Sequence, residues 1–197
     1  MLLNNFAIGN RIKKNKLFID PFNPEKLRAA SYVLTLSNRT RRWIPNSTPI
    51  RLWEAKAADR HLTEISNDLD FTIAPGEFML ACTAEQIGVP ADLYGIISPL
   101  SHIARFGLSI HCGADFINPG FGMNSRSSLV LELYNCNSSP LILTSGMPIA
   151  HIKFGRVDFL EGQPSPVPGS VYEGMDPLTP PRYYEEWSKK RIRNVNE

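Results

Sequence analysis

Residues 97–154 read ISPLSHIARFGLSIHCGADFINPGFGMNSRSSLVLELYNCNSSPLILTSGMPIAHIKF. This stretch joins apolar, alternating runs through turns rich in Gly, Pro and Asn, which is the pattern of short antiparallel strands. Similar runs precede it at residues 28–38, 71–74, 78–83 and 93–97. Residues 71–74 and 78–83 flank Pro75 and Gly76 and are predicted to form a hairpin, followed by a loop at 85–90. The sequence therefore predicts an all-β barrel or sandwich.

Three polar residues in the quoted stretch are candidates for chemistry: Ser101, Arg105 and Glu132. Ser101 and Arg105 are four residues apart, so a short helical turn would point both the same way. Glu132 lies in the strand pattern LVLELY, where a carboxylate is either on the solvent face or buried with a partner. A guanidinium is the natural partner, and a Glu held by Arg and Ser can act as a general base. From the residues alone, both an ordinary surface strand and a general base remain open.

Four motifs together carry a resemblance to a known family. They are SxxARxGL at 101–108, GADxINPGF at 113–121, LVLELYN at 129–135 and LTSGMPIAHIKF at 143–154. Their order resembles the superfamily of trimeric dCTP deaminases and dUTPases, and it is more similar to the deaminase branch. The resemblance implies a distorted β-barrel or jelly roll of the dUTPase-like type, with a short N-terminal helix and a C-terminal tail.

The resemblance also implies roles for individual residues. Glu132 matches the general base, Arg105 the arginine that orients this carboxylate and keeps it ionised, and Ser101 the serine that holds the attacking water or the departing ammonia. The further positions implied to contact substrate are His102 in place of a serine, Ala114 through its backbone at the pyrimidine edge, Asn118 at the sugar 3′-hydroxyl, Val130 and Leu131 beside the base, and Tyr172 as the tail tyrosine that stacks near the sugar or base.

The chain departs from the family pattern at positions that matter for function. Leu100 stands where deaminases have a phosphate-binding arginine. Asn118 replaces an aspartate that is the catalytic base in the triphosphatase branch, and an amide cannot accept a proton as a carboxylate does. Arg126, in a segment longer than usual after Pro119, either replaces the missing arginine or is an exposed loop charge. The basic residues at 39–42 are likewise either a phosphate-facing group or an exposed patch.

The preferred function is hydrolytic deamination of dCTP to dUTP and ammonia, by a homotrimer with active sites between subunits. Mg²⁺ is expected to arrive with the triphosphate, because this ion prefers phosphate oxygens and water to an all-protein cage. Two alternatives stay open: a dUTP diphosphatase activity, which Asn118 argues against, and an inactive nucleotide-binding sensor, which Leu100 and His102 favour. Ser101, Arg105 and Glu132 argue against the sensor.

Length and composition set the remaining expectations. The 197 residues suggest a β domain at residues 1–160 and a Pro- and Gly-rich tail with a short terminal helix at 161–197. Near the N-terminus, Leu2, Leu3, Phe6 and Ile8 are predicted to share one face of a helix, in a run too short and interrupted to span a membrane.

Charge and metal-binding residue types argue against several classes of protein. A net charge of +2 gives no argument for a nucleic-acid surface. The three cysteines, Cys82, Cys112 and Cys136, show no paired spacing and suit reduced thiols in a cytoplasmic protein. The HxE and PCxxC segments of zinc-dependent deaminases are absent from the sequence, so the predicted deamination proceeds without zinc.

Overall fold

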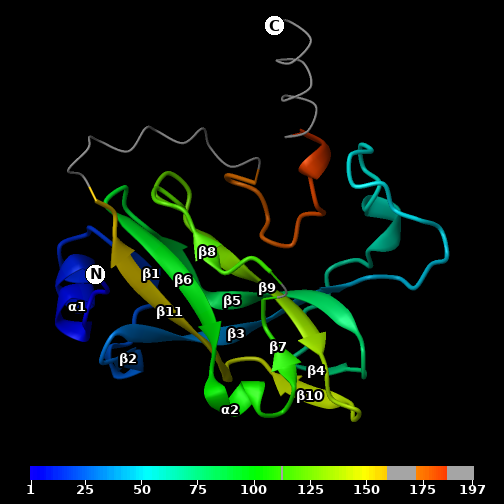
Figure 1. The fold of residues 1–197 in the computed structure, drawn as a ribbon, viewed down its shortest axis with the longest axis horizontal. Helices are drawn as coiled ribbons and strands as arrows, with labels where there is room; N and C mark the ends of the chain where they lie inside the picture. Colours follow the sequence, from blue (N-terminus) through cyan, green and yellow to red (C-terminus); the bar gives the residue numbers. More distant parts are fainter. Residues whose placement is uncertain (112, 159–171, 186–197) are drawn as a thin grey trace, which may run out of the picture.

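Antiparallel pairing of short strands builds the fold, as the alternating sequence predicts. The computed structural model describes residues 1–111, 113–158 and 172–185. Within these residues, nine strands form one curled sheet whose main path runs β7-β9-β5-β3-β11-β6-β8, and β10 pairs with β4 in a second small sheet (Figure 1). The strands are β1 Phe18–Asp20, β2 Leu27–Arg28, β3 Ser31–Arg42, β4 Asp70–Ile73, β5 Phe78–Gly88, β6 Leu93–Pro99, β7 Leu108–Ser109, β8 Phe116–Ile117, β9 Ser127–Asn135, β10 Leu141–Thr144 and β11 Pro148–Arg156.

The core lies inside the curl of the sheet, and strand alternation fills it. In β9, Leu129, Leu131 and Leu133 are buried while the residues between them are more exposed. Their buried neighbours come from β3, β5 and β11, among them Leu34, Met79 and Phe154. Because side chains alternate between the two faces of a strand, this arrangement leaves the even-numbered residues of β9 on the outer face. The predicted all-β class is confirmed.

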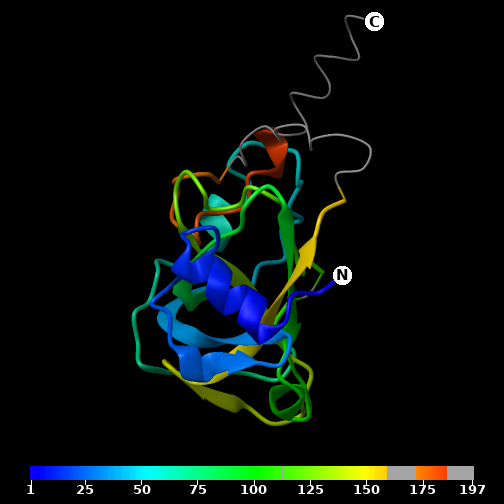
Figure 2. The same ribbon diagram turned by 90° about the vertical axis from the view of Figure 1, so that its left-hand side faces the viewer.

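The N-terminal helix α1, Asn5–Lys13, is also confirmed, but the face predicted for it is wrong. The Asn4 side chain caps the helix by accepting a hydrogen bond from the Ala7 N–H at 2.9 Å. Ile8 is fully buried, whereas Phe6 is 77% exposed, since residues two apart lie on different sides of a helix. Leu3 precedes the helix and donates its N–H to Phe154 O of β11 at 2.8 Å. Figure 2 shows α1 lying across the side of the sheet.

The hairpin predicted at Pro75 and Gly76 does not form. β4 pairs with β10, in register from Leu141 opposite Ile73 to Thr144 opposite Asp70. The turn between β4 and β5 is instead held by the end of β9: Gly76 N–H donates to Asn135 O, and Asn135 N–H donates to Glu77 O. These bonds direct β4 away from β5, so the two strands end in different sheets.

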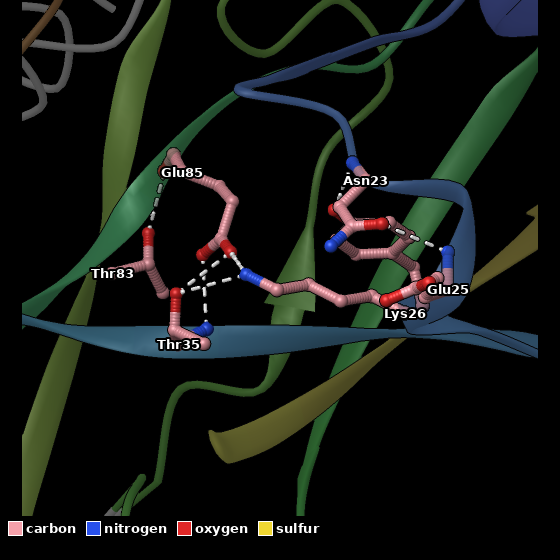
Figure 3. A network of polar contacts seen from close by, with 7 residues as sticks. Asn23, Glu25, Lys26, Thr35, Thr83 and Glu85 are labelled. Carbon is pink, nitrogen blue, oxygen red and sulfur yellow. Dashed lines mark hydrogen bonds and ion pairs between the residues drawn. The ribbon is translucent and has the colours of Figure 1, made fainter. Parts of the chain in front are cut away.

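The segment predicted as a loop at residues 85–90 is largely strand, because β5 continues to Gly88. On one edge, β5 pairs with β3 up to Thr83 and then with β1 from Gln86 to Gly88. The exchange of partners leaves the Thr35 N–H of β3 without a ladder acceptor. Glu85 supplies one, and its fully buried carboxylate accepts from the Thr35 N–H at 2.9 Å and from the Thr35 hydroxyl at 2.8 Å (Figure 3).

Lys26 completes this buried network from the 3₁₀ helix η1, Pro24–Lys26. Its ammonium lies 2.8 Å from Glu85 Oε1 and keeps a quarter of its side chain exposed. A buried carboxylate is tolerated only when charge and hydrogen bonds compensate its lost hydration. Three donors do so here, and they tie β3, β5 and the N-terminal segment together.

The other short helices are α2, Ser101–Ala104, and the 3₁₀ helix η2, Asp59–His61. No helix within residues 1–111, 113–158 and 172–185 is long and apolar enough to cross a membrane. The predicted boundary at residue 160 falls outside the described residues, and of the predicted terminal helix the described residues 183–185 are helical.

Replacing Glu85 tests the network. We expect Glu85→Ala to lower the free energy of unfolding by about 2–4 kcal/mol, because it leaves the buried Thr35 donors unpaired and Lys26 without its partner. Glu85→Gln should cost less, since the amide oxygen still accepts. Urea denaturation measures both, with the exposed Glu64→Ala as control, expected within about 0.5 kcal/mol of the parent. Equal stability of Glu85→Ala and Glu64→Ala would contradict this account.

Candidate active site

Glu132 occupies the middle of β9 on its outer face. It lies opposite Leu80 of β5, and its N–H donates to Ile110 O at 3.0 Å on the other edge of the strand. Val130 and Tyr134 flank it on the same face and are partly exposed, while Glu132 itself is half-buried. Strand pairing on both edges therefore fixes where this carboxylate points.

Ser101 and Arg105 lie at the two ends of α2, which supplies the helical turn on which their predicted common orientation depends. Ser101 begins the helix, and Arg105 follows its last residue and donates its N–H to Ser101 O at 3.2 Å. Both side chains are exposed, and so is His102 between them. Within the described residues, the Arg105 guanidinium has no hydrogen-bond or ion-pair partner.

The structure does not bring α2 and Glu132 together within one chain. After α2, the chain enters β7, where Leu108 lies opposite Asn135 at the far end of β9. Glu132 is three residues from Asn135, which is about 10 Å along an extended strand. Figure 1 shows α2 at the edge of the molecule, beyond the end of β9. One chain therefore presents Glu132 on one surface and Ser101 with Arg105 at another.

The positions predicted around the pyrimidine and sugar lie near β8. Ala114 and Asn118 are exposed on either side of this short strand. Two hydrogen bonds fix the turn after β8. The Phe121 N–H donates to Asn118 O at 3.2 Å, and the Val89 N–H donates to Phe121 O at 2.7 Å. β8 itself is Phe116–Ile117, with Phe116 exposed and Ile117 buried, and Ala114 and Asn118 lie just outside it.

Two apolar positions differ in what they can offer a substrate. Val130 is exposed on the face that carries Glu132. Leu131 was predicted beside the base, but its side chain is fully buried in the core on the opposite face, so only its backbone remains available. Leu100, at the position of the missing phosphate arginine, packs against the same core and carries no charge.

Arg126 is held by the N-terminal segment. Its guanidinium lies 4.4 Å from the centre of the Phe18 ring and 3.6 Å from Asp20 Oδ2. Contact with an aromatic face and a carboxylate both stabilise a guanidinium. The side chain is nearly half exposed, so Arg126 is an anchored loop charge at the start of β9 in this chain.

The tail returns to the face of the sheet that carries Glu132. Leu178 is fully buried against Leu80 and Cys82 of β5, with Ile65 and Phe78 packed around them. Tyr172, the predicted stacking tyrosine, is 40% exposed, and its hydroxyl accepts from the Arg182 N–H at 2.7 Å. The tail therefore covers the strand next to β9.

The three arginines at residues 39–42 have partners within the chain. Arg39 pairs with Asp176 of the tail, Arg41 donates to Leu178 O at 3.0 Å, and Arg42 pairs with Glu77. Burial raises the pKa of Asp176, but the hydrogen bonds from Arg39 and from the Leu178 N–H, together with the charges of Arg39 and Arg41, outweigh this effect, so the pKa lies below its ordinary value. In this conformation the basic cluster holds the tail and a turn rather than presenting a free phosphate-binding patch.

The described residues offer no protein metal site. Among them, no group of three His, Cys, Asp or Glu side chains could hold a metal ion. His151 lies in β11, and burial, followed by the charges of Lys153 and Arg28, lowers its pKa. Ser31 Oγ of β3 lies 3.2 Å from Nδ1 of His151, so the imidazole ring has a structural hydrogen-bond partner on the neighbouring strand.

Comparison with known proteins decides the family. A family described as dCTP deaminase-like matches residues 2–157. The chain belongs to the dCTP deaminase-like family. A relative from Methanoculleus marisnigri named "dCTP deaminase, dUMP-forming" is 31% identical over 94% of this chain and 96% of its own, and one of the same name from Acidothermus cellulolyticus is 32% identical over 98% and 100%.

A solved structure supports the fold of this dCTP deaminase-like chain. The 2′-deoxycytidine 5′-triphosphate deaminase from Agrobacterium tumefaciens matches with a TM-score of 0.60 at 20% identity, over 78% of this chain and 47% of that one. The family match and the named relatives confirm the predicted superfamily and show that the family is one of enzymes, and this structural match confirms the dUTPase-like fold.

The sequence prediction missed the residues that hold β9 in place. Thr83 and Glu85 lie in the run FMLACTAEQIGV, where they and Gln86 are three polar residues in an otherwise apolar strand pattern, and of the three Gln86 is exposed. Thr83 and Glu85 are both buried and hydrogen-bonded. The sequence signal for these two residues is their polar character inside a largely apolar run. Buried polar groups are nearly always hydrogen-bonded, so such residues point to a buried hydrogen-bond network.

The tail of this dCTP deaminase-like chain can be tested through Cys82. Burial raises the pKa of the Cys82 thiol, which is 1% exposed under Leu178, so little reactive thiolate forms at neutral pH. We expect Leu178→Ala to accelerate alkylation of Cys82 and to leave the exposed Cys136 unchanged. Peptide-resolved mass spectrometry after iodoacetamide labelling measures both thiols. An unchanged rate at Cys82 would show that Leu178 does not cover it.

Proposed function

We propose that this protein catalyses hydrolytic deamination of dCTP without zinc, with Glu132 as the general base. The observation that carries the proposal is the placement of Glu132. The backbone of β9 is paired on both edges at this residue, and the half-buried carboxylate lies on the outer face beside the partly exposed Val130. The family match, which includes this strand, supports it.

The chemistry follows from the roles of three side chains. Glu132 accepts a proton from water as the water oxygen bonds to C4 of the cytosine ring. The proton then passes to the amino nitrogen, the C4–N bond breaks, and ammonia leaves with a uracil nucleotide as the other product. Arg105 keeps Glu132 in its charged form through the favourable interaction of opposite charges, and Ser101 holds the water.

The same geometry supports a homotrimer as part of the proposal. Ser101 and Arg105 are exposed on α2 and lie beyond the end of the strand that carries Glu132. A second copy can supply them to Glu132, and a closed ring of three copies repeats this contact at every interface. Substrate then contacts His102, Ala114, Asn118, Val130 and Tyr172 between subunits, and Mg²⁺ enters with the triphosphate as part of the substrate.

A second candidate adds hydrolysis of the phosphate chain. The relatives from M. marisnigri and A. cellulolyticus are named dUMP-forming, and this chain is similar to them over nearly its whole length. Asn118 cannot serve as the base of that second step, because an amide does not accept a proton as a carboxylate does. A dUMP-forming reaction in this chain therefore requires another base.

Product analysis tests both candidates. The purified protein is incubated with Mg²⁺ and dCTP, dCMP or dUTP, and the products are resolved by anion exchange. Deamination of dCTP with release of ammonia is the expected result, and dUMP from either triphosphate establishes the second candidate. Measurable nucleotide binding without turnover of any of the three would overturn the proposal in favour of a sensor.

Glu132→Gln tests the role of the base. We expect kcat for ammonia release to fall by at least about 10²-fold, since the isosteric amide cannot take the proton. Binding of dCTP, measured by calorimetry, should change little because the shape of the site is kept. The exposed Glu64→Gln is the matched control and should retain parental kcat. Normal turnover by Glu132→Gln would show that this carboxylate is not the base.

A further inference from the structure

The start of β9 contains an irregularity three residues before Glu132. Val130 lies opposite Cys82 and Ser128 lies opposite Gln86, so residues 83–85 of β5 bulge out opposite Leu129. A bulge removes regular ladder bonds. A one-residue slip at this point would turn every later side chain of β9 to the other face and would place Glu132 in the core.

Thr83 repairs the ladder at the bulge. The Leu129 N–H donates to Thr83 Oγ1 at 2.9 Å, and the Thr83 hydroxyl donates to Glu85 O at 2.7 Å. A hydroxyl can accept and donate at once, so a single side chain joins β9 to the bulge. Thr83 is 1% exposed and Leu129 is also buried, which leaves no easy access for water.

Glu85 stabilises the opposite side of the same bulge. Its carboxylate holds Thr35 of β3 and the ammonium of Lys26, while its backbone carbonyl accepts from Thr83 (Figure 3). The contacts of Arg126 with Phe18 and Asp20 secure the residue just before β9. The N-terminal segment thus fixes the bulge through Lys26 and the start of β9 through Arg126.

We propose that Thr83 is a positioning residue for Glu132: its hydroxyl, held by the Glu85 bulge, sets the register of β9 and so aims the carboxylate. This role rests on the proposed function of Glu132. Thr83 is buried and touches no substrate, so it acts through the strand. A displacement of about 1 Å in a reacting group can reduce the rate by about 10²-fold. The bond from the Leu129 N–H to Thr83 lies three residues before Glu132 on the same strand, and we expect its loss to shift the carboxylate on that scale.

The test compares three variants of the whole protein. Thr83→Val keeps the shape and removes the hydroxyl, Thr83→Ser keeps the hydroxyl, and Thr72→Val alters an exposed strand threonine in β4. For each we measure kcat and KM for dCTP, thermal unfolding, and hydrogen exchange of the peptide covering residues 127–135.

We expect Thr83→Val to lower kcat on the order of 10²-fold, to leave KM little changed, and to accelerate exchange in residues 127–135. Thr83→Ser should restore kcat and exchange protection, and Thr72→Val should match the parent in both. If Thr83→Val does not fold, Thr83→Ala, which leaves room for water at the Leu129 N–H, is measured in the same way.

Two results would overturn the proposal: parental kcat in a folded Thr83→Val protein, or a loss in Thr83→Ser as large as that in Thr83→Val. Hydrogen exchange separates this proposal from the proposed function. If the parent protein does not turn over dCTP, the function fails, but exchange still decides whether Thr83 sets the register of β9. Unchanged exchange in Thr83→Val overturns that role whether or not the protein is active.

Discussion

The sheet depends on the hydrogen bonds and the ion pair that the buried carboxylate of Glu85 makes with Thr35 and Lys26. Near Glu85, the pairing partner of β5 changes from β3 to β1. Such a change leaves backbone N–H groups without a ladder acceptor, and these groups need another hydrogen-bond partner. Glu85 accepts from Thr35 on one side, while the Thr83 hydroxyl accepts from Leu129 on the other. Side chains thus replace ladder acceptors on both edges of β5, and the register of β9 follows.

The outer face of β9 follows from that register. Leu129, Leu131 and Leu133 fill the core, so Glu132 must face outward between Val130 and Tyr134. The exposed apolar side chains around the candidate site fit the same arrangement: Phe106 after α2 and Phe116 on β8 are more than half exposed in one chain. In the proposed homotrimer, a second copy completes the site and supplies the surface that covers such residues.

Local patterns in the sequence predicted the elements of the site better than their pairing. The alternation in LVLELYN predicted β9 but left open whether Glu132 faces solvent or is buried with a partner. The spacing of Ser101 and Arg105 suits the helical turn that α2 supplies. The hairpin of β4 with β5 was predicted wrongly, because hydrogen bonds from the turn to Asn135 are non-local and have no signature in residues 71–83. Glu85 resembled a loop residue, since its burial depends on Lys26 and Thr35, which are far away in sequence.

The central claim is that one chain supplies Glu132 and another supplies Ser101 and Arg105. It is tested most directly by mixing two inactive variants, Glu132→Gln and Arg105→Ala, after unfolding and refolding them together. With random assembly, about one quarter of the interfaces join an intact Glu132 to an intact Arg105, so the account predicts recovery of about one quarter of the parental ammonia release. Variants that form mixed oligomers but stay inactive would contradict the account and place the whole site within one chain.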